Sequence, residues 1–388
     1  MRKFKADIVY TLSSSPIENG LVVTDDNGTI LQVKQYESEE NVEVLQGAIC
    51  PGFVNTHCHL ELSYLQNKLC EKKGLHEFIK EIEALKQPAS AEIEEAINTA
   101  YQKMYANGIV AVGDICNTND TLNVKLKSQI YFHNFVEVFA FHPDRAEAAF
   151  AKGKKVYDTF IENKLNASIV PHAPYSVSDK LWKLITDLAT ENNSILSIHN
   201  QENEDENLLF TQAKGKILER LKSFGIDTSF WKSKGINSLQ YVLQFLPQHL
   251  KSLLVHNTFT TENDIENALK THANLWWCFC PNANLYIENK LPNYSVFKKQ
   301  LNRLTVGTDS LASNHDLCVL SELKIIAKHA AIFSTQDLLQ IACANGARFL
   351  GIEKQFGTIE IGKKPGLVLL KNLEQNNISQ QSTAQRLV

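Results

Sequence analysis

The chain has 388 residues, of which 44% are apolar and 21% are charged. This composition supports a large hydrophobic core and excludes an intrinsically disordered chain. The formal net charge of −4 argues against a protein that mainly grips nucleic acid, because phosphate binding usually needs a basic surface. No apolar run approaches the roughly 20 residues of a membrane span, and the run at residues 8–10 is too short for a signal peptide. We therefore expect a cytoplasmic protein without a nucleic-acid or membrane partner.

Both ends of the chain consist of short apolar stretches separated by turn signals. Near the N-terminus, strands are predicted at residues 6–10, 20–23 and 29–33, with a hairpin turn at 25–28. Near the C-terminus, two more strands are predicted at 357–362 and 366–370. Neither end alone can bury an apolar face, so we expect the two ends to pair. The prediction is one small β-sandwich domain made of residues 1–49 and 355–388.

Between the two ends, apolar and β-branched runs alternate with amphipathic stretches. Eight of these runs are predicted strands, and they lead to polar or sulfur-containing residues: His57, Asp114, Glu137, His172, His199, His256, Cys280 and Asp309. Helices are predicted between several of them, at residues 91–106, 179–192 and 262–270. Eight βα units with reactive side chains at the strand ends indicate an α/β fold, a (β/α)8 TIM-like barrel over residues 50–354 with its active site at that edge. An open, doubly wound sheet is the alternative.

The sequence His-Cys-His at residues 57–59 is the first sign of metal chemistry. Side chains two residues apart on an extended segment point to the same side, so both imidazoles can reach one ion. Such a pair is weak by itself, but His199, His256 and Asp309 also follow predicted strands. Histidines together with one carboxylate are a suitable coordination set for zinc or iron(II).

A glutamate follows one of these histidines by three residues, in the segment 199–202. Glu202 can therefore lie beside a metal without coordinating it, where it could accept a proton from water and return it to a leaving group. The alternative is that Glu202 only begins the acidic, solvated run at residues 202–206.

Six motifs, taken together, give the chain a family resemblance. They are Pro-Gly-Phe-Val-Asn-Thr-His-Cys-His-Leu at residues 51–60, Pro-His-Ala-Pro-Tyr-Ser at 171–176, His-Asn-Gln-Glu at 199–202, Val-His-Asn at 255–257, Cys-Pro-Asn-Ala-Asn at 280–284 and Gly-Thr-Asp-Ser-Leu-Ala-Ser-Asn at 307–314. With these motifs in this order, the sequence resembles the amidohydrolase superfamily. More narrowly, it is similar to the branch of metal-dependent nucleoside and nucleobase deaminases and chlorohydrolases. The motifs span almost the whole chain and are specific jointly, although each alone is not.

The resemblance implies one divalent metal ion, held by His57, His59, His199 and Asp309. Zinc is the expected ion, although iron(II) accepts the same ligands. The resemblance also implies that Glu202 moves protons, that His256 orients or polarises the metal-bound water, and that Asp309 takes a proton from that water. Binuclear members need a lysine near the end of the fourth strand. Residues 171–174 contain none, so a mononuclear site is expected.

The resemblance further implies the reaction and narrows the substrate. The pattern His-x-His-Leu-Glu-x-Ser at residues 57–63 looks like a subset that includes aminodeoxyfutalosine deaminases, and related enzymes act on S-adenosylhomocysteine. We therefore expect hydrolytic deamination of an aminated purine, a 5′-modified adenosine of this kind, by a metal-activated hydroxide with release of ammonia. The alternatives are guanine or pyrimidine deamination, dechlorination of a triazine-like ring and opening of a cyclic amide. A barrel without catalysis would predict a damaged ligand set, whereas all the ligand candidates are present.

Three residues are expected to contact the substrate: His172, Glu61 and Ser310. His172 matches a substrate-contacting histidine of this branch, whereas Glu61 is equally suited to anchor its loop through a salt bridge. The segment 208–247 is longer than one crossover needs. It either covers the pocket or contacts a second subunit, and a homodimer is the commonest soluble assembly.

Overall fold

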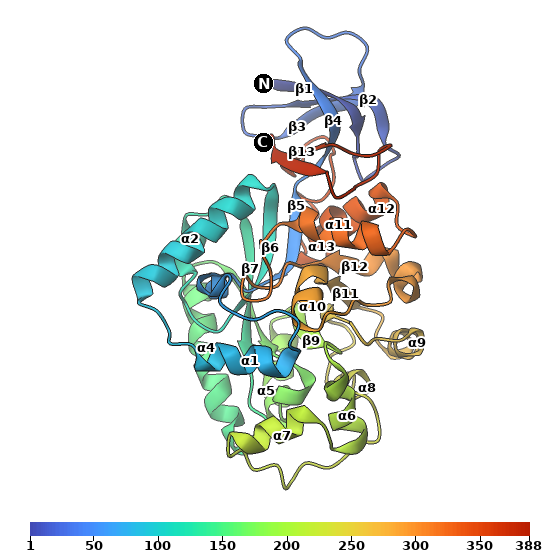
Figure 1. Ribbon diagram of the computed structural model, residues 1–388. Coiled ribbons are helices and arrows are strands. Elements are labelled where there is room, and N and C mark those ends of the chain that lie inside the picture. Colours follow the sequence, from blue (N-terminus) through green and yellow to red (C-terminus); the bar gives the residue numbers. More distant parts are fainter.

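The computed structural model describes residues 1–388 and contains a small sheet and a larger α/β body. Figure 1 shows that both chain termini lie in the small sheet, which stands at one end of the larger body. None of the helices combines the length and the apolar composition needed to cross a bilayer.

The small sheet is built from both ends of the chain, as predicted. Its strands are β1 (Arg2–Val9), β2 (Ile17–Thr24), β3 (Ile30–Gln35), β4 (Glu43–Pro51), β13 (Leu367–Lys371) and β14 (Thr383–Arg386). They pair in the order β14-β13-β4-β1-β2-β3, with β1 and β4 parallel and the other neighbours antiparallel.

These strands form one sheet, whereas a sandwich of two sheets was predicted. The strands β14 and β3 are the two edges of this sheet. Val388, which follows β14, nevertheless packs against Gly28 in the turn between β2 and β3, which shows that the sheet bends and brings its edges together. The bend buries a separate cluster that includes Phe4, Val22 and Leu367. The sandwich prediction is thus corrected to a single bent, mixed sheet that covers its own concave face.

Two strand predictions near the domain junctions are wrong. Residues 357–362 are not a strand, because Gly357 (φ +88°) and Gly362 (φ +86°) are left-handed, which an extended strand does not allow. The apolar run before His57, predicted as one barrel strand, is divided between β4 of the small sheet and β5 (Phe53–Cys58). The break falls at Gly52, where a Cβ atom would lie 2.2 Å from Val110 Cγ1, so no side chain fits. The assignment of residues 1–49 and 355–388 to one domain and 50–354 to the other stays a prediction.

The larger body contains eight parallel strands in two sheets of four. One sheet has the order β5-β6-β7-β8, with β6 (Ile109–Cys116), β7 (Tyr131–Val138) and β8 (Asn166–Pro171). The other has the order β12-β11-β10-β9, with β9 (Leu196–Asn200), β10 (Ser252–His256), β11 (Leu275–Phe279) and β12 (Leu304–Val306). Backbone hydrogen bonds cross both seams, from His199 N to His172 O (3.0 Å) and from Thr308 N to His57 O (3.0 Å). The arrangement is of the TIM-barrel type.

Helices connect and surround these strands. They are α1 (Leu75–Ala84), α2 (Ser90–Ala106), α3 (Leu122–Leu126), α4 (Ala146–Glu162), α5 (Asp179–Glu191), α6 (Glu204–Gln212), α7 (Lys216–Ser223), α8 (Ser238–Val242), α9 (Glu262–Thr271), α10 (Pro281–Ile287), α11 (Val319–His329), α12 (Thr335–Leu339) and α13 (Gly346–Leu350). Short 3-10 segments lie at Leu60–Leu65, Pro143–Arg145, Pro174–Ser176 and Tyr294–Arg303, and a π-helical turn lies at Gln340–Asn345.

The predicted helices α2, α5 and α9 are confirmed, with ends within two residues of those expected. Side-chain caps fix two of the starts, since Ser178 Oγ accepts from Leu181 N before α5 and Thr261 accepts from Asp264 N before α9.

The segment 208–247 packs over the cavity side of the barrel. It contributes part of α6 together with α7 and α8, and Figure 1 places these helices at the end of the body opposite the small sheet. Its residues Phe210, Ile217 and Tyr241 share a buried cluster with Leu75 and Phe78 of α1. The segment therefore buries apolar surface within the chain, which favours the covering role over a subunit contact.

Candidate active site

Four predicted ligands meet where the parallel strands end. His59 Nε2 lies 3.2 Å from His57 Nε2, 3.3 Å from His199 Nε2 and 3.2 Å from Asp309 Oδ1. His57 Nε2 lies 3.4 Å from the same Asp309 oxygen. The four side chains come from β5, the turn after it, β9 and the segment after β12. They lie close together because the strands close into a barrel.

The geometry of this four-atom cluster fits one divalent ion. Zinc bonds to nitrogen and oxygen of about 2.0–2.1 Å in a tetrahedron separate neighbouring ligand atoms by about 3.3 Å, close to the spacings found here. Burial lowers the pKa of His59 to about 3 and also lowers the pKa values of His57 and His199, so these imidazoles are neutral. Burial alone would raise the pKa of Asp309, but the hydrogen bond with His57 and the surrounding histidines lower it. Three neutral imidazoles and one carboxylate form a suitable donor set.

Neighbouring groups fix the orientation of two of these ligands. His199 Nδ1 donates to the backbone oxygen of His172 at 2.7 Å, which leaves a lone pair on the Nε2 that faces the cluster. Ser313 Oγ donates to Asp309 Oδ2 at 2.5 Å, which leaves Oδ1 for the cluster. The sequence placed Ser313 inside a motif without giving it a role.

His256 and Glu202 lie beside the cluster. Candidate ligand atoms of His57, His199, His256 and Asp309 all lie within 4.8 Å of one another. His256 Nδ1 donates to Asn284 Oδ1 at 2.8 Å, and its Nε2 faces Glu202 Oε1 at 3.8 Å. The orienting role of Asn284 was also not predicted.

Glu202 is not part of a solvated acidic run. Its side chain is buried, and burial raises its pKa to about 7 although His256 opposes the shift. Of the acidic residues that follow, Glu204 is exposed, whereas Glu206 is buried and accepts a hydrogen bond from Gln201 N at 2.9 Å. The structure thus distinguishes three glutamates that look alike in sequence.

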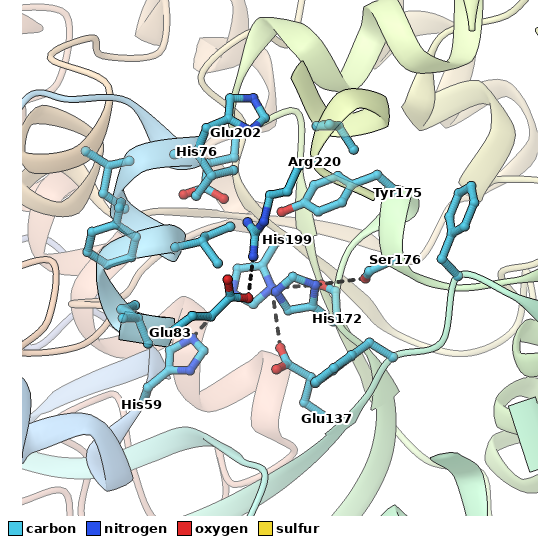
Figure 2. A pocket seen from close by; sticks show the side chains of 18 of the residues that line it. His59, His76, Glu83, Glu137, His172, Tyr175, Ser176, His199, Glu202 and Arg220 are labelled. Carbon is cyan, nitrogen blue, oxygen red and sulfur yellow. Dashed lines mark hydrogen bonds and ion pairs between the residues drawn. The ribbon is translucent and has the colours of Figure 1, made fainter. Parts of the chain in front are cut away.

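A cavity of about 440 Å³ opens onto the cluster and includes His59, His199, His256, Glu202 and Asp309 in its lining. Away from the cluster its wall is largely apolar and comes from α1, α7 and the segment after β7 (Phe78, Ile79, Ile82, Phe139, Phe141, Ile217, Leu221 and Phe224). The Glu83 carboxylate of α1 and the Arg220 guanidinium of α7 form an ion pair of 2.6 Å, as Figure 2 shows. This ion pair therefore connects α1 and α7, the two helices that cover the cavity.

The three predicted substrate contacts have different outcomes. His172 lines the cavity, and its Nδ1 is hydrogen-bonded to Ser176 Oγ at 2.8 Å. Ser310 also lines the cavity, but its hydroxyl is engaged with Ser313 Oγ at 3.1 Å.

Glu61 is placed away from the substrate cavity, which corrects its assignment as a substrate contact. It is buried and absent from the cavity lining. Its oxygens accept hydrogen bonds from Asn117 N at 2.9 Å and from Thr118 N and Oγ1 at 3.0 and 2.8 Å. The carboxylate therefore anchors the loop after β6, as the alternative proposed, through hydrogen bonds and without a basic partner.

One further acidic residue in the cavity had no predicted role. Glu137 lies at the end of β7, and Figure 2 shows its carboxylate next to His199 and His172. Its Oε2 accepts from Asn117 Nδ2 at 3.2 Å, whereas its Oε1 is buried without a hydrogen-bond partner. Burial raises the pKa of Glu137 to about 8.

Similar proteins are found both by sequence and by structure. A 5-methylthioadenosine/S-adenosylhomocysteine deaminase of Teredinibacter turnerae is 26% identical over 363 residues, which cover 88% of this chain and 76% of the relative. The structure of Helicobacter pylori aminofutalosine deaminase in complex with methylthio-coformycin matches with a TM-score of 0.78 at 23% identity, over 96% of this chain and 93% of that chain. The structure of Arthrobacter aurescens atrazine chlorohydrolase complexed with zinc matches with a TM-score of 0.79 at 14% identity, over 100% of this chain and 95% of that chain.

The two structural matches show a shared fold, and the family itself is shown by sequence. The model of the amidohydrolase family matches residues 48–385, which include every motif and all four atoms of the cluster. The chain belongs to the amidohydrolase family.

Proposed function

We propose that this protein is a metal-dependent aminohydrolase that removes the exocyclic amino group of a 5′-modified adenosine and releases ammonia. The observation that carries the proposal is the four-atom cluster with Glu202 buried beside it in the same cavity. The names of two similar proteins support the substrate class, one a 5-methylthioadenosine/S-adenosylhomocysteine deaminase and the other an aminofutalosine deaminase.

The residues that would hold the metal are His57, His59, His199 and Asp309. Zinc is the proposed ion, since a structural neighbour was crystallised with zinc and the donor set is nitrogen and oxygen. When bound, a divalent ion supplies the Lewis acidity that makes water a good nucleophile near neutral pH.

The protein side chains around the cluster divide the proton transfers. Asp309 is oriented through Oδ2 by the Ser313 hydroxyl, and this carboxylate would take the proton of the attacking water. Glu202 faces the same space and delivers a proton to the ring nitrogen next to the reacting carbon, which makes the ring accept the nucleophile. His256, fixed by Asn284, orients the water through its Nε2. The amino group then takes the proton held by Asp309 and leaves as ammonia, while Glu202 recovers a proton from the hydroxyl group on the reacting carbon.

The cavity suits a modified nucleoside better than a bare base. Its volume of about 440 Å³ is within the range for small-molecule sites. Most of the polar lining groups lie at the strand ends, whereas the wall from α1 and α7 is apolar apart from His76 and the Glu83–Arg220 ion pair. A purine at the cluster would leave this outer wall to a 5′ substituent.

An ammonia-release screen tests the proposal. Purified protein with a measured content of one metal per chain would be offered adenosine, 5′-methylthioadenosine, S-adenosylhomocysteine and aminodeoxyfutalosine, with adenine and guanine as free bases. Chloride release from a chlorotriazine would be measured in parallel. We expect ammonia from at least one 5′-modified adenosine, at a higher kcat/KM than from either free base. Chloride release without ammonia from any adenosine derivative would overturn the proposal.

A further inference from the structure

Glu137 is a buried acid in the cavity that the proposed mechanism does not use. It is the penultimate residue of β7, its side chain lines the cavity, and only 7% of the residue is exposed. Asn117 Nδ2 donates to Oε2, but no protein group bonds to Oε1. A polar atom that is buried without a hydrogen-bond partner is rare and destabilising, so such atoms call for a partner.

The position of Glu137 argues against a role as a metal ligand. Its Oε1 lies 3.5 Å from His199 Nδ1, on the side of the ring away from the Nε2 that faces the cluster. The hydrogen on Nδ1 is already donated to the backbone oxygen of His172 at 2.7 Å. Glu137 therefore lies one imidazole ring away from the reacting centre, and its free oxygen needs a partner from outside the protein.

We propose that Glu137 binds a ribose hydroxyl of the substrate, at the 2′ or the 3′ position. The inference rests on the proposed function and makes it more specific. A 5′-modified adenosine offers hydrogen-bond donors at its amino group and at these two hydroxyls, apart from whatever its 5′ substituent carries. The amino group must lie at the cluster, because it is the leaving group, and the 5′ substituent is directed to the outer wall. The ribose hydroxyls are then the donors left for Glu137.

A hydroxyl also fits the carboxyl group in either protonation state. It donates to a carboxylate, and it accepts from a protonated carboxyl group, whose hydrogen must be on Oε1 because Oε2 already accepts from Asn117. A ring nitrogen would suit only the protonated form. A side-chain nitrogen of His172 lies within 4.8 Å of a Glu137 oxygen, so a second polar group lies beside the same hydroxyl site.

A substrate-and-variant cycle tests the assignment. Wild-type protein, Glu137→Ala and Glu137→Gln would be assayed on adenosine, 2′-deoxyadenosine, 3′-deoxyadenosine and 3-deazaadenosine, and the affinity for each would be measured by calorimetry. We expect Glu137→Ala to lower kcat/KM for adenosine by about 10–100-fold, since hydrogen bonds to charged groups are the stronger ones. On the deoxy analogue that lacks the contacted hydroxyl, the loss should fall below about threefold. The exposed Glu204→Gln is the matched control and should change neither.

The outcomes separate this inference from the proposed function. Equal losses on adenosine and on both deoxy analogues would show that Glu137 only supports His199, and would overturn the inference alone. Loss of the effect with 3-deazaadenosine instead would assign the contact to a ring nitrogen and would also overturn it. Wild-type protein that neither deaminates nor binds adenosine derivatives would overturn the proposed function together with the inference. Metal content and Tm of the variants should match those of the wild type.

Discussion

The buried ion pair between Lys125 and Asp114 gives the largest predicted effect on stability. Both side chains are fully buried, and Lys125 Nζ lies 2.5 Å from Asp114 Oδ2. Lys125 Nζ also donates to Asn134 Oδ1 at 2.7 Å. The other oxygen, Asp114 Oδ1, accepts from Leu60 N at 2.9 Å, directly after the proposed ligand His59. The pair therefore connects the core of the barrel to the turn that carries the proposed metal ligand His59.

The substitution Lys125→Met would remove the positive charge and keep most of the chain length. The ammonium lies 5.2 Å from the ring centre of Phe132 and 5.1 Å from that of Phe160, so a thioether meets an apolar environment. The cost arises at Asp114, which would be left buried without a counter-charge, and breaking such a pair on one side costs about 3–5 kcal/mol. With an unfolding entropy of about 2.1 cal/mol/K per residue, a chain of 388 residues shifts by about 1.2 °C per kcal/mol, so Tm should fall by about 4–6 °C.

The assay is thermal and urea unfolding of wild type, Lys125→Met, Asp114→Asn and the double variant. We expect the double variant to lose less than the two single losses combined, by at least about 1 kcal/mol, because neither charge is then left alone. Lys183→Met is the matched control, since Lys183 pairs with Asp187 at 2.9 Å on the surface of α5 and should contribute about 0.5 kcal/mol or less. If Lys125→Met cost no more than this control, the reasoning from burial would be refuted.

Three further predictions concern the site. Glu202→Gln should keep its metal and lose more than about 100-fold in kcat, whereas the exposed Glu204→Gln should not change kcat; both are measured by ammonia release with metal analysis. Ser313→Ala should weaken metal affinity by about 10–100-fold, because Asp309 loses the bond that orients it, and competition with a chelating dye measures this. Removing the metal with a chelator should abolish activity and lower Tm, and added zinc should restore both; unchanged activity in metal-free protein would contradict the site.

The positions of the proposed ligands and the general fold could be predicted because their signals are local. A run of buried residues that ends in histidine or aspartate shows where a parallel strand stops, and the carboxyl ends of such strands meet at one edge. His59, His199 and Asp309 needed only that rule and the family motifs. The starts of α5 and α9 could also be predicted, because their capping side chains, Ser178 and Thr261, act within three residues along the chain.

The errors fall where a distant part of the chain decides the outcome. The end of β4 at Gly52 depends on Val110, which leaves no space for a side chain. The role of Glu61 depends on the backbone of Asn117 and Thr118, so its hydrogen bonds are not visible in the motif around it. The surroundings of Glu137 also depend on distant parts of the chain, since only the folded barrel shows that one of its oxygens is buried without a partner.

Three residues of the site have a left-handed backbone conformation that their residue types do not predict. Gln201 (φ 45°), His256 (φ 72°) and Asp309 (φ 57°) are all left-handed, at or just after the ends of β9, β10 and β12. Each such conformation costs about 1–3 kcal/mol in a residue other than glycine, and it persists only when surrounding contacts fix it. Here the contacts are present: Glu206 Oε1 accepts from Gln201 N, and the backbone oxygen of His57 accepts from Asp309 N at 3.1 Å. Local backbone preference alone would favour glycine at these three positions. Because contacts within the barrel support the sharp turn at each strand end, two of the positions can carry the functional side chains of His256 and Asp309.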